Sequence, residues 1–227
     1  MSEPDTPERI LDAAERLFMA HGFEATTLRM ITTEAKANLA AANYHFGGKE
    51  GLIEALFRRR LGWLNAQWLA ALDKAEAEAH GQALRPHQVL EAFFGTTIRT
   101  VAQCDEGGRH FMRLLGRTYT EPSAFIRRFM AREYADVVRR HKAALFRALP
   151  DAPKEEVLWR FHFMLGAMSY AISGADALNV LGEDGLHDLD PEALHDRFMG
   201  FLFGGLRAPL PEFASKPIKK PRRTKAA

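Results

Sequence analysis

Apolar residues recur at helical spacing along almost the whole chain, and this pattern limits the fold more than any other feature. Between residues 6 and 206 they return at the period of an α-helix, as in Ile10, Leu11, Ala14 and Phe18. No segment alternates apolar and polar residues as a half-buried strand would, and no segment is repeated. We therefore predict an all-α protein.

Capping residues and glycines divide this pattern into separate helices. The first helix starts at Thr6 and stops at Gly22. Thr27 and Asn38 are good caps for two short helices, and Lys49 opens a long helix after a pair of glycines. The predicted ranges are 6–22, 28–35, 38–46 and 49–83, followed by 89–102, 109–119, 123–149, 155–181 and 191–206.

The amino-acid composition indicates a reducing compartment but does not by itself identify a binding partner. Cys104 is the only cysteine of 227 residues, so no disulfide forms within the chain and we expect a cytoplasmic protein. We also expect no signal peptide and no membrane-spanning segment. The net charge is +2, but six basic residues lie between positions 216 and 225, which leaves the remaining chain at −4. Any affinity for DNA must therefore come from a local surface.

The three N-terminal helices have the proportions of a helix-turn-helix, whose third helix enters the major groove of DNA. Leu39, Ala42 and Phe46 share one face of this helix and are expected to face the core. On the other face, alanines can approach thymine methyl groups and the Asn43 amide can bond adenine. Tyr44 and its neighbours suit phosphates. The predicted DNA-contacting residues are Thr27, Arg29, Lys36, Asn38, Ala40, Ala41, Asn43, Tyr44, His45 and Lys49.

This region resembles the DNA-binding domain of TetR-family transcriptional repressors over about residues 8–64. The resemblance implies a homodimer that binds a palindromic operator. Family members usually carry glycine where this chain has Lys36; if that turn requires a positive φ, lysine costs about 1 kcal/mol more than glycine. Lys36 can also add a phosphate contact. The motifs that carry the resemblance are Ile10-Leu11-Asp12-Ala13-Ala14, Gly22-Phe23, Thr26-Thr27-Leu28-Arg29 and Asn38-Leu39-Ala40-Ala41-Ala42-Asn43-Tyr44-His45-Phe46-Gly47-Gly48-Lys49-Glu50.

Other interpretations of this region stay open. A three-helix packing module that never touches DNA would show similar periodicity, and residues 1–60 hold eight basic against nine acidic residues. Arg29 is as well suited to a surface ion pair, and His45 to a structural role. With the DNA-binding interpretation, we divide the chain into a helix-turn-helix domain (1–48), a connecting helix (49–83), a ligand-binding and dimerisation domain (84–210) and a disordered basic tail (211–227).

The resemblance implies a dimer interface made by the last two long helices of each subunit. Small residues on one helix allow close approach, and phenylalanines on the other supply buried area. The same residues could instead form ordinary core within one chain. The predicted interface residues are Gly166, Ala167, Ala171, Gly174, Phe198, Phe201, Leu202 and Gly205.

The middle of the chain is rich in aromatic residues and methionine, which suit an adaptable apolar pocket but also an ordinary helical core. Two stretches, beginning at Phe111 and at Trp159, are similar to the fatty-acid-responsive PsrA-like branch of the family. That similarity implies release by a long-chain fatty acid or its CoA thioester and control of lipid-metabolism genes. Another hydrophobic effector, with control of efflux or stress genes, is the alternative. Arg113 and His162 are candidates for the acyl headgroup. The predicted ligand-binding residues are Phe111, Met112, Arg113, Leu115, Trp159, His162, Phe163 and Met164.

Signatures of catalysis are weak in this sequence. It has no glycine-rich phosphate loop, no His-Glu-x-x-His pair and no nucleophile elbow, so we predict neither an enzyme nor a cofactor. His187, Asp188, Asp190, His195 and Asp196 resemble metal ligands by composition, but a helix cap at Asp190 and loop polarity explain them better, and we predict no metal site.

Overall fold

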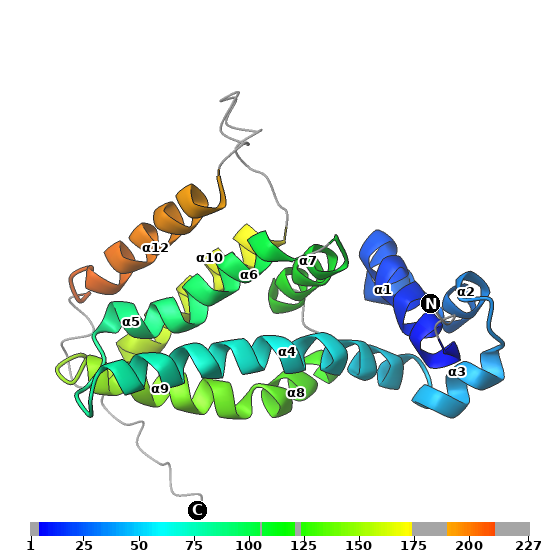
Figure 1. The fold of residues 1–227 in the computed structure, drawn as a ribbon, viewed down its shortest axis with the longest axis horizontal. Helices are drawn as coiled ribbons and strands as arrows, with labels where there is room; N and C mark the ends of the chain where they lie inside the picture. Colours follow the sequence, from blue (N-terminus) through cyan, green and yellow to red (C-terminus); the bar gives the residue numbers. More distant parts are fainter. Residues whose placement is uncertain (1–4, 105, 121–123, 174–189, 212–227) are drawn as a thin grey trace, which may run out of the picture.

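The computed structural model describes residues 5–104, 106–120, 124–173 and 190–211, and within these ranges every regular element is a helix, as predicted (Figure 1). Three helices form a head at one end: α1 Thr6–Ala25 and the short helices α2 Leu28–Glu34 and α3 Leu39–Phe46. The long helix α4 Lys49–Glu78 extends from the head along the rest of the molecule (Figure 1).

Local signals fix the boundaries of the head helices. The cap of α1 is Asp5 rather than Thr6, because the Asp5 carboxylate accepts a hydrogen bond from the Thr6 N–H at 2.7 Å. Gly22 breaks the helical geometry with a φ of 79°, and one further turn follows it. Thr27 caps α2 through the Met30 N–H at 3.2 Å, and Asn38 caps α3 through the Ala41 N–H at 2.6 Å. Both predicted caps are confirmed.

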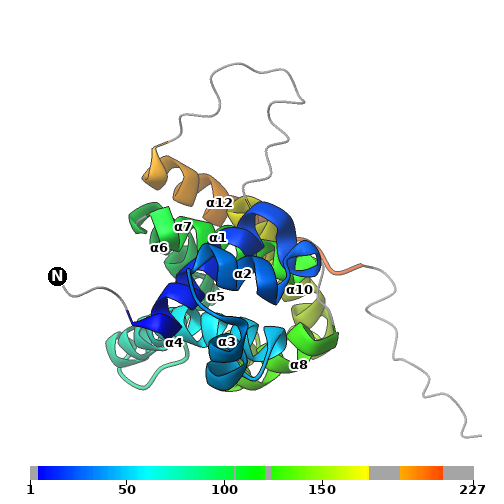
Figure 2. The same cartoon turned by 90° about the vertical axis from the view of Figure 1, so that its right-hand side faces the viewer.

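The remaining helices form a bundle around α4. Helix α7 contacts both α1 of the head and α10, so it links the head to the far side of the bundle (Figures 1 and 2). None of the described helices is long and apolar enough to cross a bilayer. The bundle elements are α5 Pro86–Leu90, η1 Glu91–Gly95, α6 Thr96–Gln103, α7 Glu106–Thr120, α8 Ala124–Glu133, α9 Ala135–Ala148, α10 Lys154–Ile172 and α12 Pro191–Arg207.

The predicted helix 49–83 ends at Glu78, because the chain turns at His80 and Gly81 with positive φ. Three further ranges differ from the observed helices. The range 89–102 contains one π-helical turn, η1, between α5 and α6. The range 123–149 is two helices, because Tyr134 leaves helical geometry with φ −94° and ψ 2° and its buried ring packs on Trp68. The range 155–181 reaches Ile172 as α10, and its residues from 174 onward lie outside the described part of the chain.

A continuous apolar core joins the head to the bundle through α4. Phe18 and Leu56 are fully buried in the head, and Trp68 is fully buried further along α4. The Trp68 indole stacks on Phe93 of η1 at 4.6 Å and donates a hydrogen bond to Thr97 Oγ1 at 2.9 Å. Packing changes in the bundle can therefore reach the head along α4.

Candidate nucleic-acid interface and cavity

Helix α3 is anchored by few side chains and leaves most of its surface in solvent. Ala42 is fully buried and Phe46 half-buried, as predicted. Leu39 was expected to join them but is 46% exposed, because side chains lean toward the N-terminus of a helix and Leu39 is the first residue of α3. Its side chain therefore extends beyond the surface on which Ala42 packs.

The free side of α3 carries the residues predicted to meet DNA. Asn43 and His45 are exposed, and Tyr44 is 86% exposed with its ring edge-on to that of His45 at 5.1 Å. Ala40 is exposed and Ala41 half-buried. A narrow, exposed helix with an amide, a phenol and an imidazole has the shape and the chemistry needed in a major groove.

Basic and capping residues lie around the two turns that flank α3. Thr27 and Arg29 are exposed at the start of α2, and Arg29 forms no ion pair with any residue in the described ranges. Lys36 has a φ of 51°, so the turn before α3 does require a positive φ. Lys49, the first residue of α4, donates from Nζ to the Glu24 carbonyl at 3.3 Å and so ties α4 to the end of α1.

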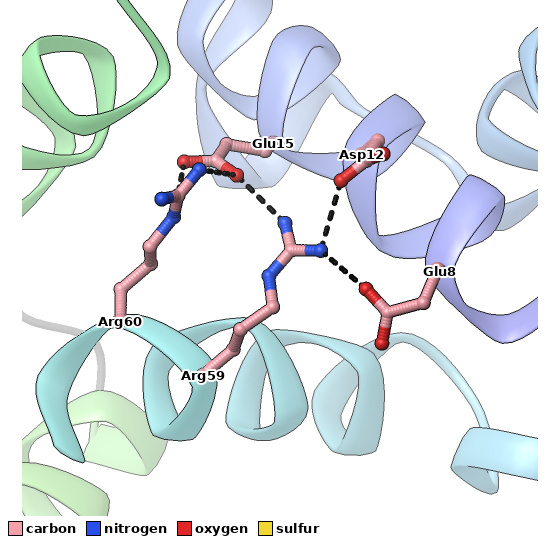
Figure 3. Close-up of polar contacts among 5 residues, drawn as sticks. All are labelled: Glu8, Asp12, Glu15, Arg59 and Arg60. Atoms are coloured by element: carbon pink, nitrogen blue, oxygen red, sulfur yellow. Dashed lines mark hydrogen bonds and ion pairs between the residues drawn. The ribbon is translucent and has the colours of Figure 1, made fainter. Parts of the chain in front are cut away.

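A cluster of ion pairs fixes α1 against α4 (Figure 3). The Arg59 guanidinium donates to Glu8 at 2.9 Å and to Asp12 and Glu15 at 2.8 Å. Arg60 donates through Nε and Nη2 to both oxygens of Glu15 at 3.1 Å. Burial works against the Arg59 charge, but hydrogen bonds to Asp12 and Glu8 and the charge of Glu15 outweigh it and raise the Arg59 pKa above its ordinary value.

This cluster was not predicted from the sequence, although a signal was present. Glu8, Asp12 and Glu15 follow one another at i, i+4 and i+7 and therefore share one face of α1. Adjacent arginines at 59 and 60 were available to face them from the next long helix.

Helices α10 and α12 carry an exposed apolar face that we call the α10/α12 face: Trp159, Phe163, Gly166, Tyr170, Phe201 and Gly205. Phe163 is 67% and Phe201 68% exposed, and Trp159 stacks on Phe163 at 5.8 Å. Predicted interface residues Gly166, Ala171, Phe201 and Gly205 are exposed, and Ala167 is half-buried.

Two of the predicted interface residues face the other way. Phe198 and Leu202 are 9% and 1% exposed and belong to the core of the chain, because an α12 that is apolar on several sides turns one stripe inward. Gly174 lies outside the described residues.

The residues predicted to bind a ligand do not surround a common cavity. Phe111, Met112, Leu115 and Met164 are buried, whereas Arg113, Trp159, His162 and Phe163 are exposed. They are separated because α10 is apolar on two sides, and Trp159 and Phe163 lie on the outer one. Phe111 and Met112 line a separate hollow of about 350 Å³ beside Trp63 and Leu64 of α4.

An apolar cavity of about 390 Å³ lies instead between η1, α7, α8, α9 and α10. Its size falls within the range of small-molecule sites. On α10 the lining residues Leu158, Phe161 and Leu165 recur at i, i+3 and i+7. None of the three was among the residues predicted to bind a ligand. The other lining residues are Phe93, Tyr119, Met130, Ala131, Tyr134, Ala135, Val137, Val138, His141, Lys142, Leu145 and Phe146.

Three neutral polar groups interrupt the apolar wall of this cavity. Burial raises the pKa of Tyr119 to about 12 and the pKa of Tyr134 well above its ordinary value, to which the interaction with Tyr119 adds. Burial also lowers the pKa of His141, although Nδ1 bonds the Val137 carbonyl at 2.9 Å. The Tyr134 hydroxyl interacts with that of Tyr119, and among the described residues His141 Nε2 is buried without a hydrogen-bond partner.

Two family models match the chain. The model described as "Bacterial regulatory proteins, tetR family" matches residues 10–56. The model described as "Tetracyclin repressor-like, C-terminal domain" matches residues 91–205. The first covers the head and the start of α4, and the second covers the bundle with its cavity.

Individual proteins give shorter matches in sequence. The probable HTH-type transcriptional regulator YttP of Bacillus subtilis (strain 168) is 28% identical over 126 residues, which are 56% of this chain and 56% of that protein. The HTH-type nicotine-responsive transcriptional repressor HdnoR of Paenarthrobacter nicotinovorans is 40% identical over 98 residues, 43% of this chain and 48% of that protein. The chain thus spans about half the length of these relatives.

Solved structures match over nearly the whole chain. The ketosteroid transcriptional regulator KstR2 of Mycobacterium tuberculosis has a TM-score of 0.59 at 16% identity and covers 90% of this chain and 96% of its own. The fatty acid degradation regulator FadR of Bacillus halodurans has a TM-score of 0.56 at 16% identity, and the match covers 92% of this chain and 100% of that one. At this identity the likeness shows a shared fold.

Proposed function

Because the chain belongs to the TetR family of bacterial regulatory proteins, we propose that it is a transcriptional repressor that binds a palindromic operator as a homodimer and leaves DNA when an apolar ligand is bound. The observation that carries the proposal is the free side of α3, where Asn43, Tyr44 and His45 are exposed while Ala42 anchors the helix. Such a regulator acts in the cytoplasm, where the DNA is.

In the DNA-bound state α3 lies in the major groove. Asn43 bonds an adenine with its amide, and the methyl groups of Ala40 and Ala41 contact thymine. Tyr44, His45, Lys36 and Lys49 bind phosphates, with Thr27 and Arg29 on the opposite strand. In a dimer the two α3 helices are about 34–36 Å apart, which is one turn of the duplex.

The α10/α12 face supplies the dimer contact. A soluble monomer rarely exposes so many large apolar side chains in one place. Glycines at positions 166, 200, 204 and 205 have open space where a Cβ would stand, so the backbone of a partner helix can approach closely there. Pairing this face with its copy gives the isologous interface that a palindromic operator requires.

The cavity is the effector site in this proposal. A long-chain fatty acid or its CoA thioester is the first candidate, on the resemblance of the chain to fatty-acid-responsive repressors. Similar folds belong to proteins named as regulators of fatty acid degradation and of ketosteroids, and both names denote apolar compounds. The alternative is a regulator of efflux or stress genes with another hydrophobic effector.

Release requires the cavity to communicate with the head, and α7 provides a route. Its residue Tyr119 lines the cavity, and the same helix contacts α1. The ion pairs of Arg59 and Arg60 make α1 and α4 move together. A ligand that favours one position of α7 changes the distance between the two α3 helices, and a few kcal/mol of differential affinity suffices.

The first experiment measures binding of the purified protein to DNA from upstream of its own gene, at a stated salt concentration, with and without oleate and oleoyl-CoA. Release by either lipid supports a lipid-responsive repressor and identifies the form that is sensed. Tight binding that neither lipid disturbs removes the lipid effector and leaves the DNA-binding role. Failure to prefer any operator over random DNA contradicts the proposal.

A further inference from the structure

Lys142 differs from the three arginines of α9 in having no carboxylate partner. Arg139, Arg140 and Arg147 each form an ion pair with an aspartate or a glutamate. Lys142 is exposed on the same helix and pairs with no acidic residue in the described ranges. It also lines the apolar cavity, so its charge is available to a molecule that binds there.

The charge of Lys142 stands alone in the wall of the cavity. Of the lining residues none is an aspartate or a glutamate. Burial keeps Tyr119 un-ionised by raising its pKa to about 12, and it raises the pKa of Tyr134 and lowers that of His141. The lining is therefore neutral near pH 7 except for one positive charge.

Lys142 lies at the mouth of the cavity, where apolar lining residues also reach solvent. Val138, one turn earlier on α9, is 53% exposed, and Leu158 of α10 is 47% exposed. Phe146, one turn after Lys142, lines the cavity too, and the Lys154 ammonium lies 5.5 Å from the centre of its ring. The mouth thus combines uncovered apolar surface with positive charge.

We infer that the ligand of this cavity is an amphiphile with one anionic head, which places its apolar chain along the lining and its carboxylate against Lys142 at the mouth. The inference rests on the proposed function, because it takes the cavity as the effector site. The chain removes the exposed apolar side chains of the mouth from water. The carboxylate stays hydrated there, so its pairing with Lys142 avoids the desolvation cost of a buried ion pair.

The same arrangement favours a free fatty acid over its CoA thioester. A thioester carries no charge at the end of the acyl chain, so it offers Lys142 no ionic partner. The several phosphate charges of CoA would require several free cations outside the mouth, and the arginines of α9 are already paired with carboxylates of the protein. Lys142 matches a single negative charge at the end of a chain.

The test compares two ions of equal chain length and opposite charge, dodecanoate and dodecylammonium, on the full-length protein at low salt. Trp68 stacks on Phe93 of the lining, so tryptophan fluorescence can report occupancy of the cavity. An ion pair at an exposed lysine is weak, so we expect dodecanoate to bind about fivefold more tightly than dodecylammonium. Added salt should reduce this preference. Dodecanoyl-CoA should bind less tightly than dodecanoate.

Variants of Lys142 show whether the preference comes from this residue. Lys142→Met should remove most of it, and Lys142→Glu should reverse the order of the two ions. Lys74→Met and Lys74→Glu are the matched controls, because Lys74 is an exposed lysine of α4 outside the cavity lining. They change the net charge by the same amount and should keep the wild-type order.

Three results would overturn the inference. The first is that the wild-type protein binds neither ion or binds both equally, a comparison that needs no variant to fold. The second is that Lys74→Glu changes the preference as much as Lys142→Glu does. The third is that dodecanoyl-CoA binds more tightly than dodecanoate and loses this advantage in Lys142→Met.

Operator binding is measured on the same samples, which separates the inference from the proposed function. Dodecanoate that binds with the expected preference but leaves operator affinity unchanged contradicts the proposed function and not the ligand chemistry.

Discussion

Asn43 and Tyr44 are neighbours on α3, but their replacement by alanine should have different effects on DNA binding. In the proposed complex Tyr44 contacts a phosphate, so Tyr44→Ala is expected to weaken binding to operator and random DNA alike. Asn43 is proposed to contact a base edge, so Asn43→Ala should cost about 1–3 kcal/mol on the operator and much less on random DNA. Competition binding with operators altered one base pair at a time measures both effects.

Both side chains are exposed, so neither substitution should lower the thermal stability of the protein. Unfolding temperatures of the two variants serve as the control. If Asn43→Ala loses the same free energy on operator and on random DNA, Asn43 does not read a base.

His141 should make stability depend on pH in a predictable direction. Its pKa is lowered in the folded protein, and in the unfolded chain it is about 6.5. Above about pH 6.5 neither state binds the proton, and below it the unfolded state binds more protons, so the free energy of unfolding falls as the pH falls. One such group contributes at most about 1.4 kcal/mol per pH unit. Urea unfolding at fixed protein concentration between about pH 5.5 and 7.5 measures this slope.

The comparison that isolates this residue is His141→Phe against His87→Phe, which replaces an exposed histidine and serves as the control. His141→Phe should unfold with a shallower dependence on pH than the wild-type protein. Equal slopes for all three proteins would show that His141 titrates alike in the folded and unfolded states.

Helices α7 and α10 approach each other more closely at Gly116 than a side chain would allow. A Cβ at this position would stand 2.8 Å from the Ser169 carbonyl oxygen and 2.9 Å from Ile172 Cγ1. Ser169 Oγ also donates to the Gly116 carbonyl at 2.6 Å, which holds the two helices together. Gly116→Ala must push them apart, and we expect a loss of about 1–3 kcal/mol in stability, measured by urea unfolding.

The same substitution at Gly62 provides a control of opposite sign. Gly62 lies within α4, is exposed and has open space at its Cβ, so alanine there should stabilise the protein by up to about 1 kcal/mol. Destabilisation by both alanines would indicate a general intolerance of α4 and α7 rather than a close approach at Gly116.

The sequence predicts where individual helices lie, but it does not predict which face of a helix is buried when the helix is apolar on more than one side. The caps Thr27 and Asn38 are local features, and both are confirmed. Helix α10 is apolar on two sides, and spacing alone cannot say which side meets the cavity and which is exposed. Phe163 was therefore assigned to the ligand but lies on the outer side, and Phe161 on the cavity side was missed. The bend at Tyr134 depends on packing against Trp68, which no local pattern records.

The arrangement of the whole molecule gives α4 and α7 a common role. Helix α4 enters the head beside α3, and the ion pairs of Arg59 and Arg60 fasten it to α1. Helix α7 lies against α1 on one side and α10 on the other, and it reaches the cavity at Tyr119. Two helices therefore connect the bundle to the head, and the proposed release needs both, because a shift at the cavity must move the head as one body.

The α10/α12 face should decide whether the molecule can bind its operator at all. A stable dimer interface buries about 800 Å² on each subunit, mostly apolar at its centre. A charge at Phe163 or Phe201, which are 67% and 68% exposed, should disrupt it. We expect Phe201→Asp and Phe163→Asp to sediment as monomers at micromolar concentration. Without the second α3 helix, affinity for the full operator should fall about a hundredfold or more, while affinity for a half-site is unchanged.

Trp63→Asp is the matched control for the effect of a charge on an exposed aromatic position. Trp63 is 51% exposed on α4, away from the α10/α12 face, so this variant should remain a dimer with unaltered operator affinity. If Phe201→Asp and Phe163→Asp also remain dimers, the subunits meet through another surface, and the spacing of the two α3 helices has to be sought there.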